Sequence, residues 1–489
     1  MRVEADLSGG LPRFSVVGLA EGAVRESRDR VAAAVRNAGY VFPDGRLVVG
    51  LAPAELKKEG SQLDLPMALG VLAVSGQLVA EPWGADALIL GELGLDGSVL
   101  PAKGVLALAA AARERGLRWA LVPAENAREA ALGGLCPVPV SSLSEAAAVL
   151  ARPDVPRFLE GPAEEASPRS EGLDLADVRG QALARRALEL AAAGGHNLLM
   201  VGPPGSGKSM LAARLPGLLP ELTSEESLEV TKLHTLAGLR GPGAGLVTRR
   251  PFRAPHSGAR PPALLGGGPH DRPGELALAH RGVLFLDELP EFHRDTLECL
   301  RLPLEERVVR LSRANGCWEF PADCAVAAAM NPCKCGKSGM SKSACRCPWG
   351  APEKYRGRVS GPILDRLDIR VELGAIPFSD WSGRRGPPPE STAAVRERVL
   401  LARALAAKRL GRPGALNARL ESEELRRHCE LERSAWNLIE VLVERQELSG
   451  RGIDRVLRVA RTIADLAESP RIERPHVAEA VSYRGSLTS

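Results

Sequence analysis

The feature that most constrains this chain is the segment Gly-Pro-Pro-Gly-Ser-Gly-Lys-Ser at residues 202–209. A largely apolar run, 197–201, precedes it, and the pattern of residues 210–215 predicts the first turns of a helix. A G-x-x-x-x-G-K-[S/T] segment between a strand and a helix is the phosphate-binding loop of nucleotide hydrolases. The sequence therefore predicts a nucleoside triphosphate site here. A chance glycine-rich turn is the alternative, and the flanking elements disfavour it.

The residue types in this loop suit ATP and Mg²⁺. Glycines allow backbone N–H groups to turn toward an anion, and a helix N-terminus adds partial positive charge. Lys208 can reach the β- and γ-phosphates, and Ser209 can ligate Mg²⁺. The predicted nucleotide-binding residues are Gly202, Pro203, Pro204, Gly205, Ser206, Gly207, Lys208 and Ser209, together with Asp287 further along the chain.

Two further apolar runs end in polar residues that suit ATP hydrolysis. Residues 283–286 predict a buried strand that ends in Asp287 and Glu288. The aspartate can hold the Mg²⁺ shell, and the glutamate can orient and deprotonate the attacking water. A solvated strand end is the alternative. Residues 325–330 predict a neighbouring strand that ends in Asn331, whose amide can position the water, although Asn-Pro also marks a simple turn.

The composition limits which partners and which cellular compartment we expect for this protein. The length of 489 residues suggests about three domains. A net charge of +4 is small for such a length, so a nucleic-acid partner requires local basic patches. Neither a signal peptide nor an apolar run of about 20 residues is present, so we expect a cytoplasmic protein without a membrane partner. Nine cysteines, four of them clustered, favour a reducing compartment and a metal site over disulfides.

The clustered cysteines predict a structural zinc site. Cys333 and Cys335 form one pair, and Cys345 and Cys347 form a second. Zn²⁺ favours four thiolates in a tetrahedron, and each pair can supply two of its vertices. Four incidental thiols or a redox switch remain the alternatives.

The surrounding residues are strongly basic. Seven basic residues against the single acidic Glu353 give a local net charge of +6, and they are Lys334, Lys337, Lys342, Arg346, Lys354, Arg356 and Arg358. Such a patch suits nucleic acid, although an acidic protein surface would suit it equally. A second basic feature is the hairpin predicted at residues 306–320 with Asn315-Gly316 at its turn. Arg310 and Arg313 could follow a phosphate backbone there or could simply be solvated.

The chain divides into four predicted segments. Residues 1–152 mix strands (14–18, 46–49 and 120–122) with helices (21–38, 64–74 and 104–116), which predicts an α+β domain. Residues 153–171 are proline-rich and predict a linker. Residues 172–376 contain the phosphate loop, and residues 377–489 predict a loop followed by helices. One of these helices presents an apolar face that begins at Ile453, with arginines beside it.

Several motifs resemble, in order and spacing, the ComM/YifB-type magnesium-chelatase-like AAA+ ATPases. They lie at residues 250–256, 273–276, 285–292, 329–333 and 360–368, and the resemblance extends nearly to the C-terminus. It implies an α/β protein with an AAA+ αβα core around a parallel sheet and a C-terminal helical lid. One departure is His256-Ser257-Gly258, where relatives usually continue His-His-Thr.

The resemblance also assigns roles to single residues. Asp287 and Glu288 match the Walker B pair, and Asn331 matches sensor 1. Arg366 matches the arginine finger, with an ion pair to Asp365 or Asp368 as the alternative. Arg451 matches sensor 2, a cation that touches the γ-phosphate of its own subunit, although Arg455 and Arg458 are alternatives.

Residues 24–31 and 51–61 resemble the N-terminal domain of the same family, which is similar in fold to the Lon protease domain (S5-like). Lon-type proteolysis needs a serine nucleophile and a lysine base. By alignment these positions fall at Gln62 and Leu108. A shift of one residue supplies Ser61, but Lys103 then lies a turn or more too early. The domain is therefore expected to be non-proteolytic.

An arginine finger completes the site of a neighbouring subunit, so Arg366 in that role implies a ring, and the resemblance implies that the ring is a hexamer. The resemblance implies a motor that moves along DNA, single-stranded or branched, as a helicase or branch-migration enzyme in natural transformation or recombination. A chelatase-type ATPase that remodels a partner protein is the main alternative. An ATP-dependent protease is the other.

Overall fold

The computed structural model describes residues 1–18, 22–53, 60–154, 173–241, 243–268, 272–313, 316–338, 345–375, 389–445 and 448–484. The chain forms two compact units. The first comprises Met1–Ser167, Ser227–Val247 and Ser312–Cys317, and the second comprises Pro168–Glu226, Thr248–Leu311 and Trp318–Ser489. Most of the predicted linker, including residues 155–171, lies outside the described residues.

The first unit contains two three-stranded sheets. In one, β3 (Arg46–Ala52) lies between antiparallel β1 (Arg2–Ser8) and parallel β2 (Arg13–Val17). The other is parallel, with the order β4 (Ala87–Ile89), β7 (Trp119–Pro123) and β8 (Cys136–Val140). The helices are α1 (Gly22–Asn37), α2 (Asp64–Val74), α3 (Val105–Glu114), α4 (Ala127–Leu132) and α5 (Leu143–Leu150).

The hydrophobic pattern explains these elements. Alternate residues of β3 are buried, so Leu47, Val49 and Leu51 face one core, as expected for a half-buried strand. The predicted helix 64–74 is α2, and the other predicted strands and helices appear within a few residues of their expected bounds. The first unit thus has the α+β composition that the sequence predicts.

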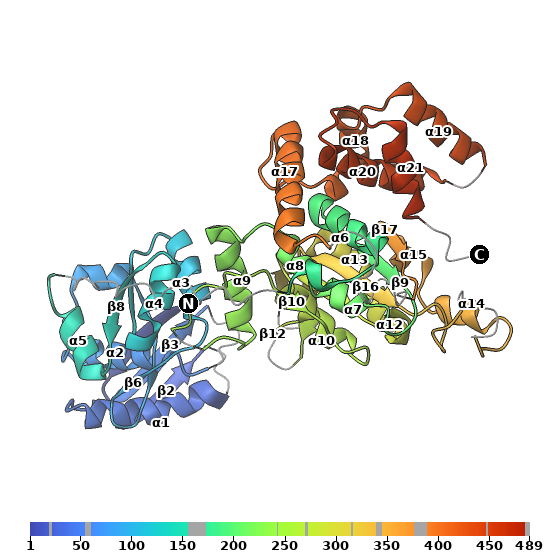
Figure 1. Ribbon diagram of the computed structural model, residues 1–489. Coiled ribbons are helices and arrows are strands. Elements are labelled where there is room, and N and C mark those ends of the chain that lie inside the picture. The colour runs from blue at the N-terminus through green and yellow to red at the C-terminus, as the bar shows by residue number, and fades with distance from the viewer. Residues whose placement is uncertain are drawn as a thin grey trace. The chain divides into compact units, whose positions relative to one another are not determined.

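The second unit is built on a five-stranded parallel sheet with the order β10-β13-β16-β9-β17 (Figure 1). The strands are β9 (Leu198–Val201), β10 (Phe252–Arg253), β13 (Val283–Leu286), β16 (Ala325–Met330) and β17 (Ile369–Glu372). Strands β9 and β13 are buried along their whole length. Their continuous apolar sequence fits a parallel sheet that is covered on both faces. Because the strands are parallel, the residues that follow β9, β13 and β16 meet at one edge.

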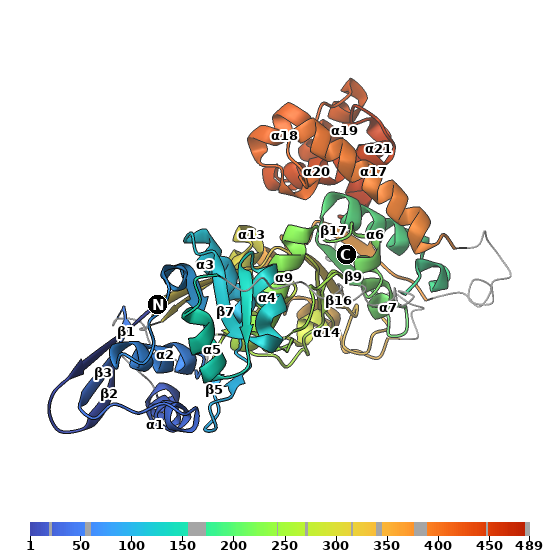
Figure 2. The same cartoon turned by 90° about the vertical axis from the view of Figure 1, so that its left-hand side faces the viewer.

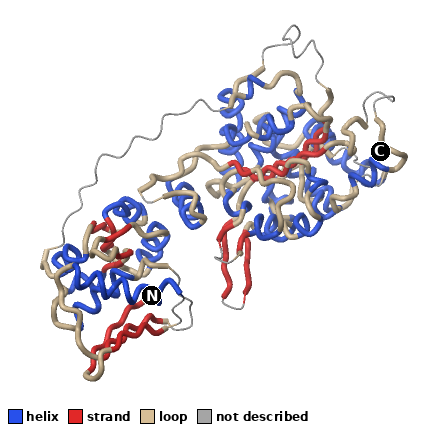
Figure 3. The backbone as a smooth tube through the Cα atoms, turned by 90° about the horizontal axis from the view of Figure 1, so that it is seen from below, coloured by secondary structure: helices blue, strands red, loops and turns tan. Residues whose placement is uncertain are grey.

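Short helices surround this sheet. They are α6 (Ala182–Gly194), α7 (Lys208–Ala212), α8 (Leu215–Leu218), α10 (Pro261–Leu265), α11 (Glu275–Leu278), α12 (Arg294–Glu298), α13 (Arg301–Glu306), α14 (Ala351–Arg356) and α15 (Gly361–Leu364). The strands β14 (Val308–Arg313) and β15 (Gly316–Pro321) pair as the predicted hairpin, drawn as a red two-stranded ribbon in Figure 3. Helix α9 (Ser224–Leu236) belongs mostly to the first unit.

The C-terminal helices share the core of the sheet. They are α17 (Thr392–Leu410), α18 (Ser422–His428), α19 (Arg433–Glu444), α20 (Gly450–Leu466) and α21 (Arg474–Ser482). Helices α17 and α20 pack against α6 (Figure 2). A single buried cluster extends from Leu188 of α6 to Val399 and Ala460. The predicted domain 377–489 therefore lies in the same compact unit as the sheet.

Polar contacts reinforce this packing. Thr462 of α20 lies 2.8 Å from Nε2 of the buried His196, which follows α6. Arg409 pairs with the buried Asp465 at 2.5 Å. Within the described residues, no helix combines the length and the apolarity that a bilayer crossing would need.

Candidate nucleotide site

The phosphate loop connects β9 to α7 at the carboxyl edge of the sheet. The N–H group of Gly202 donates to the carbonyl of Met330 on the adjacent strand β16, at 3.1 Å. Gly205 and Gly207 adopt φ values of 77° and 91°. Residues with a Cβ rarely adopt this left-handed conformation, so the two glycines permit the loop to close around an anion. The strand–loop–helix context predicted for this motif is thus present.

Lys208 lies inside this loop and, among the described residues, has no carboxylate within ion-pair distance. Its ammonium group donates to the carbonyl oxygens of Gly202 (2.7 Å) and Pro203 (2.9 Å) and to Oδ1 of Asn331 (3.2 Å). Burial lowers the pKa of the Lys208 amine, and the charges of Asp287 and Glu288 oppose this shift. A buried cation held by neutral oxygens suits a phosphate, which would supply the missing negative charge.

The carboxylates after β13 lie next to this loop. Ser209 donates its hydroxyl to Oδ2 of Asp287 at 2.8 Å. The hydroxyl and the carboxylate that were predicted to ligate Mg²⁺ are therefore in direct contact. Glu288 is exposed and follows Asp287 with φ 52°. A left-handed conformation at a non-glycine residue is strained, and such strain is concentrated at functional sites.

The residues present fit ATP and Mg²⁺. The hydroxyl of Ser206 is buried and lacks a hydrogen-bond partner among the described residues, so it is left over for a ligand. Lys208 supplies a cation, while Ser209 and Asp287 supply oxygens of the kind that Mg²⁺ prefers. Asn331 follows β16, the strand next to β9, and its contact with Lys208 places its amide at the same edge.

Gln181 is a residue of this site that sequence reasoning missed. Its side-chain amide donates to the carbonyls of Ser206 at 3.3 Å and Gly374 at 2.8 Å. It therefore joins the phosphate loop to the segment after β17. The sequence offers only a weak signal for this role of Gln181, since a single glutamine before a predicted helix is common.

Arg366 and Arg451 lie at the opposite edge of the sheet. Both line a cavity of about 930 Å³, together with Asn197 and Ala325 at the amino ends of β9 and β16. The four residues of β9 separate this edge from the phosphate loop by about 13 Å. The structure therefore does not bring either arginine to the phosphate loop of the same subunit.

The ion pairs in this cavity differ from those considered for Arg366. Arg366 pairs with Glu305 at 2.5 Å instead of Asp365 or Asp368. Asp365 pairs with Arg455 at 2.9 Å, which lowers the pKa of the Asp365 carboxyl. Arg458 donates to the carbonyl of Leu420 at 2.8 Å. Among the described residues, Arg451 is exposed and forms no ion pair.

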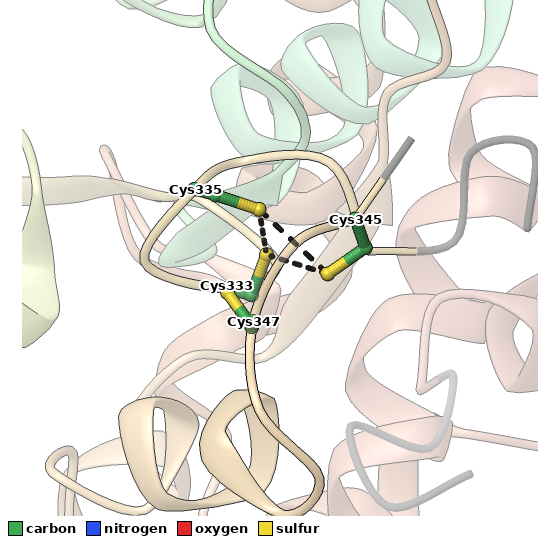
Figure 4. Close-up of side chains that lie close together, drawn as sticks. All are labelled: Cys333, Cys335, Cys345 and Cys347. Carbon is green, nitrogen blue, oxygen red and sulfur yellow. Dashed lines mark hydrogen bonds between the residues drawn. The ribbon is translucent and has the colours of Figure 1, made fainter. Parts of the chain in front are cut away.

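The four clustered cysteines converge on one point (Figure 4). The Sγ atom of Cys333 lies 3.4 Å from that of Cys335 and 3.8 Å from that of Cys345, and Cys335 and Cys345 are 3.7 Å apart. All four sulfurs, including that of Cys347, lie within 4.8 Å of one another. A tetrahedral zinc with Zn–S bonds of about 2.3 Å separates its sulfurs by about 3.8 Å, so the spacing fits the metal.

The chemistry of the cluster agrees with this spacing. Backbone N–H groups of Arg346 and Lys337 donate to Cys335 and lower the pKa of its thiol to about 6. Hydrogen bonds with neighbouring thiols help to raise the pKa of Cys345 and raise that of Cys347 to about 12, so these two thiols would need a bound cation to ionise near neutral pH. The nine cysteines, all among the described residues, are free thiols. The donor set thus fits a structural zinc ion.

The segment that carries the four cysteines, here called the cysteine loop (residues 333–338 and 345–347 of the described chain), also contacts the phosphate loop. No pattern in the sequence predicts this contact. Gly336 has φ 76°, and a Cβ built on it would lie 2.3 Å from Cδ of Pro204. The N–H of Gly336 donates to the carbonyl of Cys333 at 2.9 Å, forming a tight turn that holds Gly336 against Pro204. The turn that begins at one predicted zinc ligand therefore packs directly on the nucleotide loop.

The residues considered for proteolysis do not form a catalytic pair. Ser61 donates its hydroxyl to the carboxylate of Glu92, and no lysine amine contacts it within the described residues. Gln62 precedes α2, and Leu108 lies on α3.

A parallel sheet with a phosphate loop, a following carboxylate pair and a neighbouring asparagine defines an AAA+-like P-loop ATPase. Three family models match this chain in succession: subunit ChlI of magnesium chelatase at residues 3–126, magnesium chelatase subunit ChlI at 174–380, and the ChlI C-terminal region at 389–484. The chain belongs to this magnesium-chelatase-like family and is of the ComM/YifB type.

Relatives of similar length support this assignment. The uncharacterized protein YifB of Escherichia coli is 42% identical over 99% of this chain and 93% of its own length. Competence protein ComM of Haemophilus influenzae is 41% identical over 99% of this chain and 94% of its own. The uncharacterized protein Rv2897c of Mycobacterium tuberculosis is 44% identical over 99% and 95%. The resemblance predicted from the motifs is confirmed.

Proposed function

We propose that this protein is a ring-forming motor that hydrolyses ATP to move along DNA during natural transformation or recombination. One observation supports the formation of a ring. The groups predicted to bind and hydrolyse nucleotide gather at the carboxyl edge of the sheet, whereas Arg366 lies at the amino edge. If Arg366 acts on a nucleotide, that nucleotide would belong to a neighbouring subunit.

The carboxyl edge carries the hydrolytic chemistry. Lys208 would hold the β- and γ-phosphates, and Ser209 with Asp287 would hold Mg²⁺, which neutralises charge on the phosphates when bound. Glu288 would take the proton of the attacking water as general base. Asn331, already hydrogen-bonded to Lys208, would orient that water against the γ-phosphate.

The amino edge would serve the next subunit. Arg366 would act there as arginine finger and stabilise the negative charge of the transition state. Because Arg451 lines the same cavity, we propose that it serves that neighbouring nucleotide as well. A closed ring satisfies every subunit with one heterologous interface, and we expect a hexamer.

Two observations support DNA as the track. A relative 41% identical over nearly the full length is named a competence protein. The basic residues of the predicted patch lie in the cysteine loop, on α14 and directly after it, and Lys342 alone lies outside the described residues. The structural role of zinc would be to fix this loop, and the Lon-like first unit would serve assembly and not proteolysis. A cytoplasmic location fits this function.

The test is the steady-state ATPase rate with and without single-stranded, duplex and branched DNA. The wild-type protein is expected to hydrolyse ATP faster when DNA is present. Lys208→Ala is the control and should remain inactive under all conditions, because it removes the phosphate-binding cation. The proposal would be contradicted if the wild-type protein hydrolyses ATP but its rate is the same with and without each of these DNAs. That result would favour a chelatase-type ATPase that remodels a protein partner.

A further inference from the structure

Trp349 is the most exposed large hydrophobic residue of this protein among the described residues. Its exposure is 104% of the reference value, compared with 53% for Trp436. It lies two residues after Cys347 and directly before Gly350, whose φ of 76° starts α14. Leaving an indole entirely in water forgoes the stabilisation that its burial would give. Such a side chain suits a ligand that covers it.

The surroundings of Trp349 are cationic. Arg356 pairs with Glu353 at 3.4 Å, and Arg358 pairs with Glu291 at 3.3 Å. Four other cations of the cysteine loop and α14 are exposed and form no ion pair within the described residues. They are Lys334, Lys337, Arg346 and Lys354. Most of the positive charge in the segments that flank Trp349 in the sequence therefore has no ion-pair partner among the described residues.

The neighbouring surface argues against an ordinary protein contact. The residues on either side of Trp349 are Pro348 and Gly350, and the exposed side chains beyond them are charged. Protein interfaces usually combine several apolar and aromatic side chains at their centre. A single planar ring among cations is instead the arrangement that binds single-stranded nucleic acid, because bases stack on the ring and phosphates meet the cations.

We propose that Trp349 stacks on a base of single-stranded DNA while the four cations contact the neighbouring phosphates. This inference rests on the proposed action on DNA and specifies where the strand is held. A zinc ion held by the two Cys-x-Cys pairs would restrain Trp349, since Cys347 is a predicted zinc ligand two residues away. The same loop contacts Pro204 through Gly336, so a bound base lies on a loop that also touches the nucleotide site.

The experiment measures binding of a fluorescein-labelled 30-mer of deoxythymidine to the full-length protein by fluorescence anisotropy, with a non-hydrolysable ATP analogue present. Stacking contributes about 1–3 kcal/mol per base, so Trp349→Ala should weaken binding by about 5- to 150-fold. Trp349→Phe should be intermediate because it retains a smaller ring. Trp436→Ala is the matched control and should bind like the wild-type protein.

The dependence on salt separates stacking from charge. Trp349→Ala removes no charge. In a plot of log Kd against the logarithm of the salt concentration, its line should therefore be displaced from that of the wild-type protein but keep the same slope. The double variant Lys337→Ala/Lys354→Ala should instead reduce the slope by about 0.7 for each phosphate group that the protein no longer neutralises. These two results together support the proposed division of roles.

Three outcomes would overturn the inference. If the wild-type protein binds the 30-mer and Trp349→Ala binds it equally tightly, the stacking role is wrong. The proposed action on DNA is not contradicted by that result. If light scattering shows that Trp349→Ala no longer assembles, Trp349 is a subunit contact. If the wild-type protein itself neither binds the 30-mer nor responds to DNA in its ATPase rate, the proposed function fails together with this inference.

Discussion

At the scale of single residues, we propose that different side chains bind ATP and hydrolyse it. Lys208 is buried among carbonyl oxygens and is suited to hold phosphate. Glu288 is exposed, forms no ion pair within the described residues and sits in a strained left-handed conformation. The strain fixes the direction of this side chain relative to Asp287, whose Oδ1 accepts the N–H of Glu288 at 2.9 Å.

Replacement of Glu288 by glutamine should therefore abolish hydrolysis but not binding. General-base catalysis contributes about 10²–10⁴-fold, so kcat should fall by at least about 100-fold. The amide keeps the shape of the side chain, so the affinity for ATP should change little. Single-turnover hydrolysis and equilibrium binding of a fluorescent ATP analogue measure the two effects. Normal turnover of Glu288→Gln would show that another group activates water.

At the scale of elements, the cysteine loop packs against the phosphate loop. Gly336 closes the turn that begins at Cys333 and packs against Pro204, leaving no room for a side chain. A bound metal would hold this turn in place through Cys333 and Cys335. The loop thus links the predicted zinc site to the nucleotide site.

We therefore expect Gly336→Ala to weaken ATP binding. Overpacking costs about 1–3 kcal/mol, which corresponds to about 5- to 150-fold in affinity if the phosphate loop absorbs it. Gly350→Ala is a matched control, because Gly350 has the same φ of 76° but open space around its Cβ position. Isothermal titration with ATP measures both variants. Removal of zinc by a chelator should weaken ATP binding in the same direction.

Equal effects of the two alanine substitutions would mean that backbone strain alone is responsible. Unchanged affinity in Gly336→Ala would mean that the packing of Gly336 on Pro204 is not required. Absence of stoichiometric zinc in the purified protein would remove the metal from this explanation, although the role of the packing would remain testable.

At the scale of the whole molecule, we propose that a single chain lacks a complete catalytic site. Arg366 pairs with Glu305 at the amino edge of the sheet, whereas Lys208 and Ser209 lie at the carboxyl edge. Catalysis would then depend on assembly. The cavity that contains Arg366 and Arg451 would form one side of the interface.

Arg366→Ala should lower the ATPase rate by about 10³–10⁵-fold, as is typical when an arginine finger is removed. Because the finger acts on a neighbour, mixing Arg366→Ala with the equally inactive Lys208→Ala should restore part of the rate. Glu305→Ala is the discriminating control. It breaks the ion pair but keeps the arginine, so it should remain active if Arg366 is a finger and should resemble Arg366→Ala if the pair is only structural.

The local elements of the fold could be predicted well, because hydrophobic periodicity and turn residues are short-range signals. The helix at Asp64–Val74 and the hairpin strands β14 and β15 appear where the sequence predicts them. The relation between the sheet and the C-terminal helices could not be predicted. It depends on packing of Ala460 and Val399 against α6, and these positions are more than 200 residues away from that helix in the chain.

The sequence by itself determined the chemistry of the site, because residues 202–209, Asp287-Glu288, Asn331 and the four cysteines are recognisable from residue type and spacing. Only the tertiary structure decided which of these groups meet. It joined Asn331 to Lys208, placed Gly336 against Pro204 and separated Arg366 and Arg451 from the phosphate loop. The physical reason is that strand order and direction set which chain segments share an edge of the sheet, and neither is encoded in a local pattern.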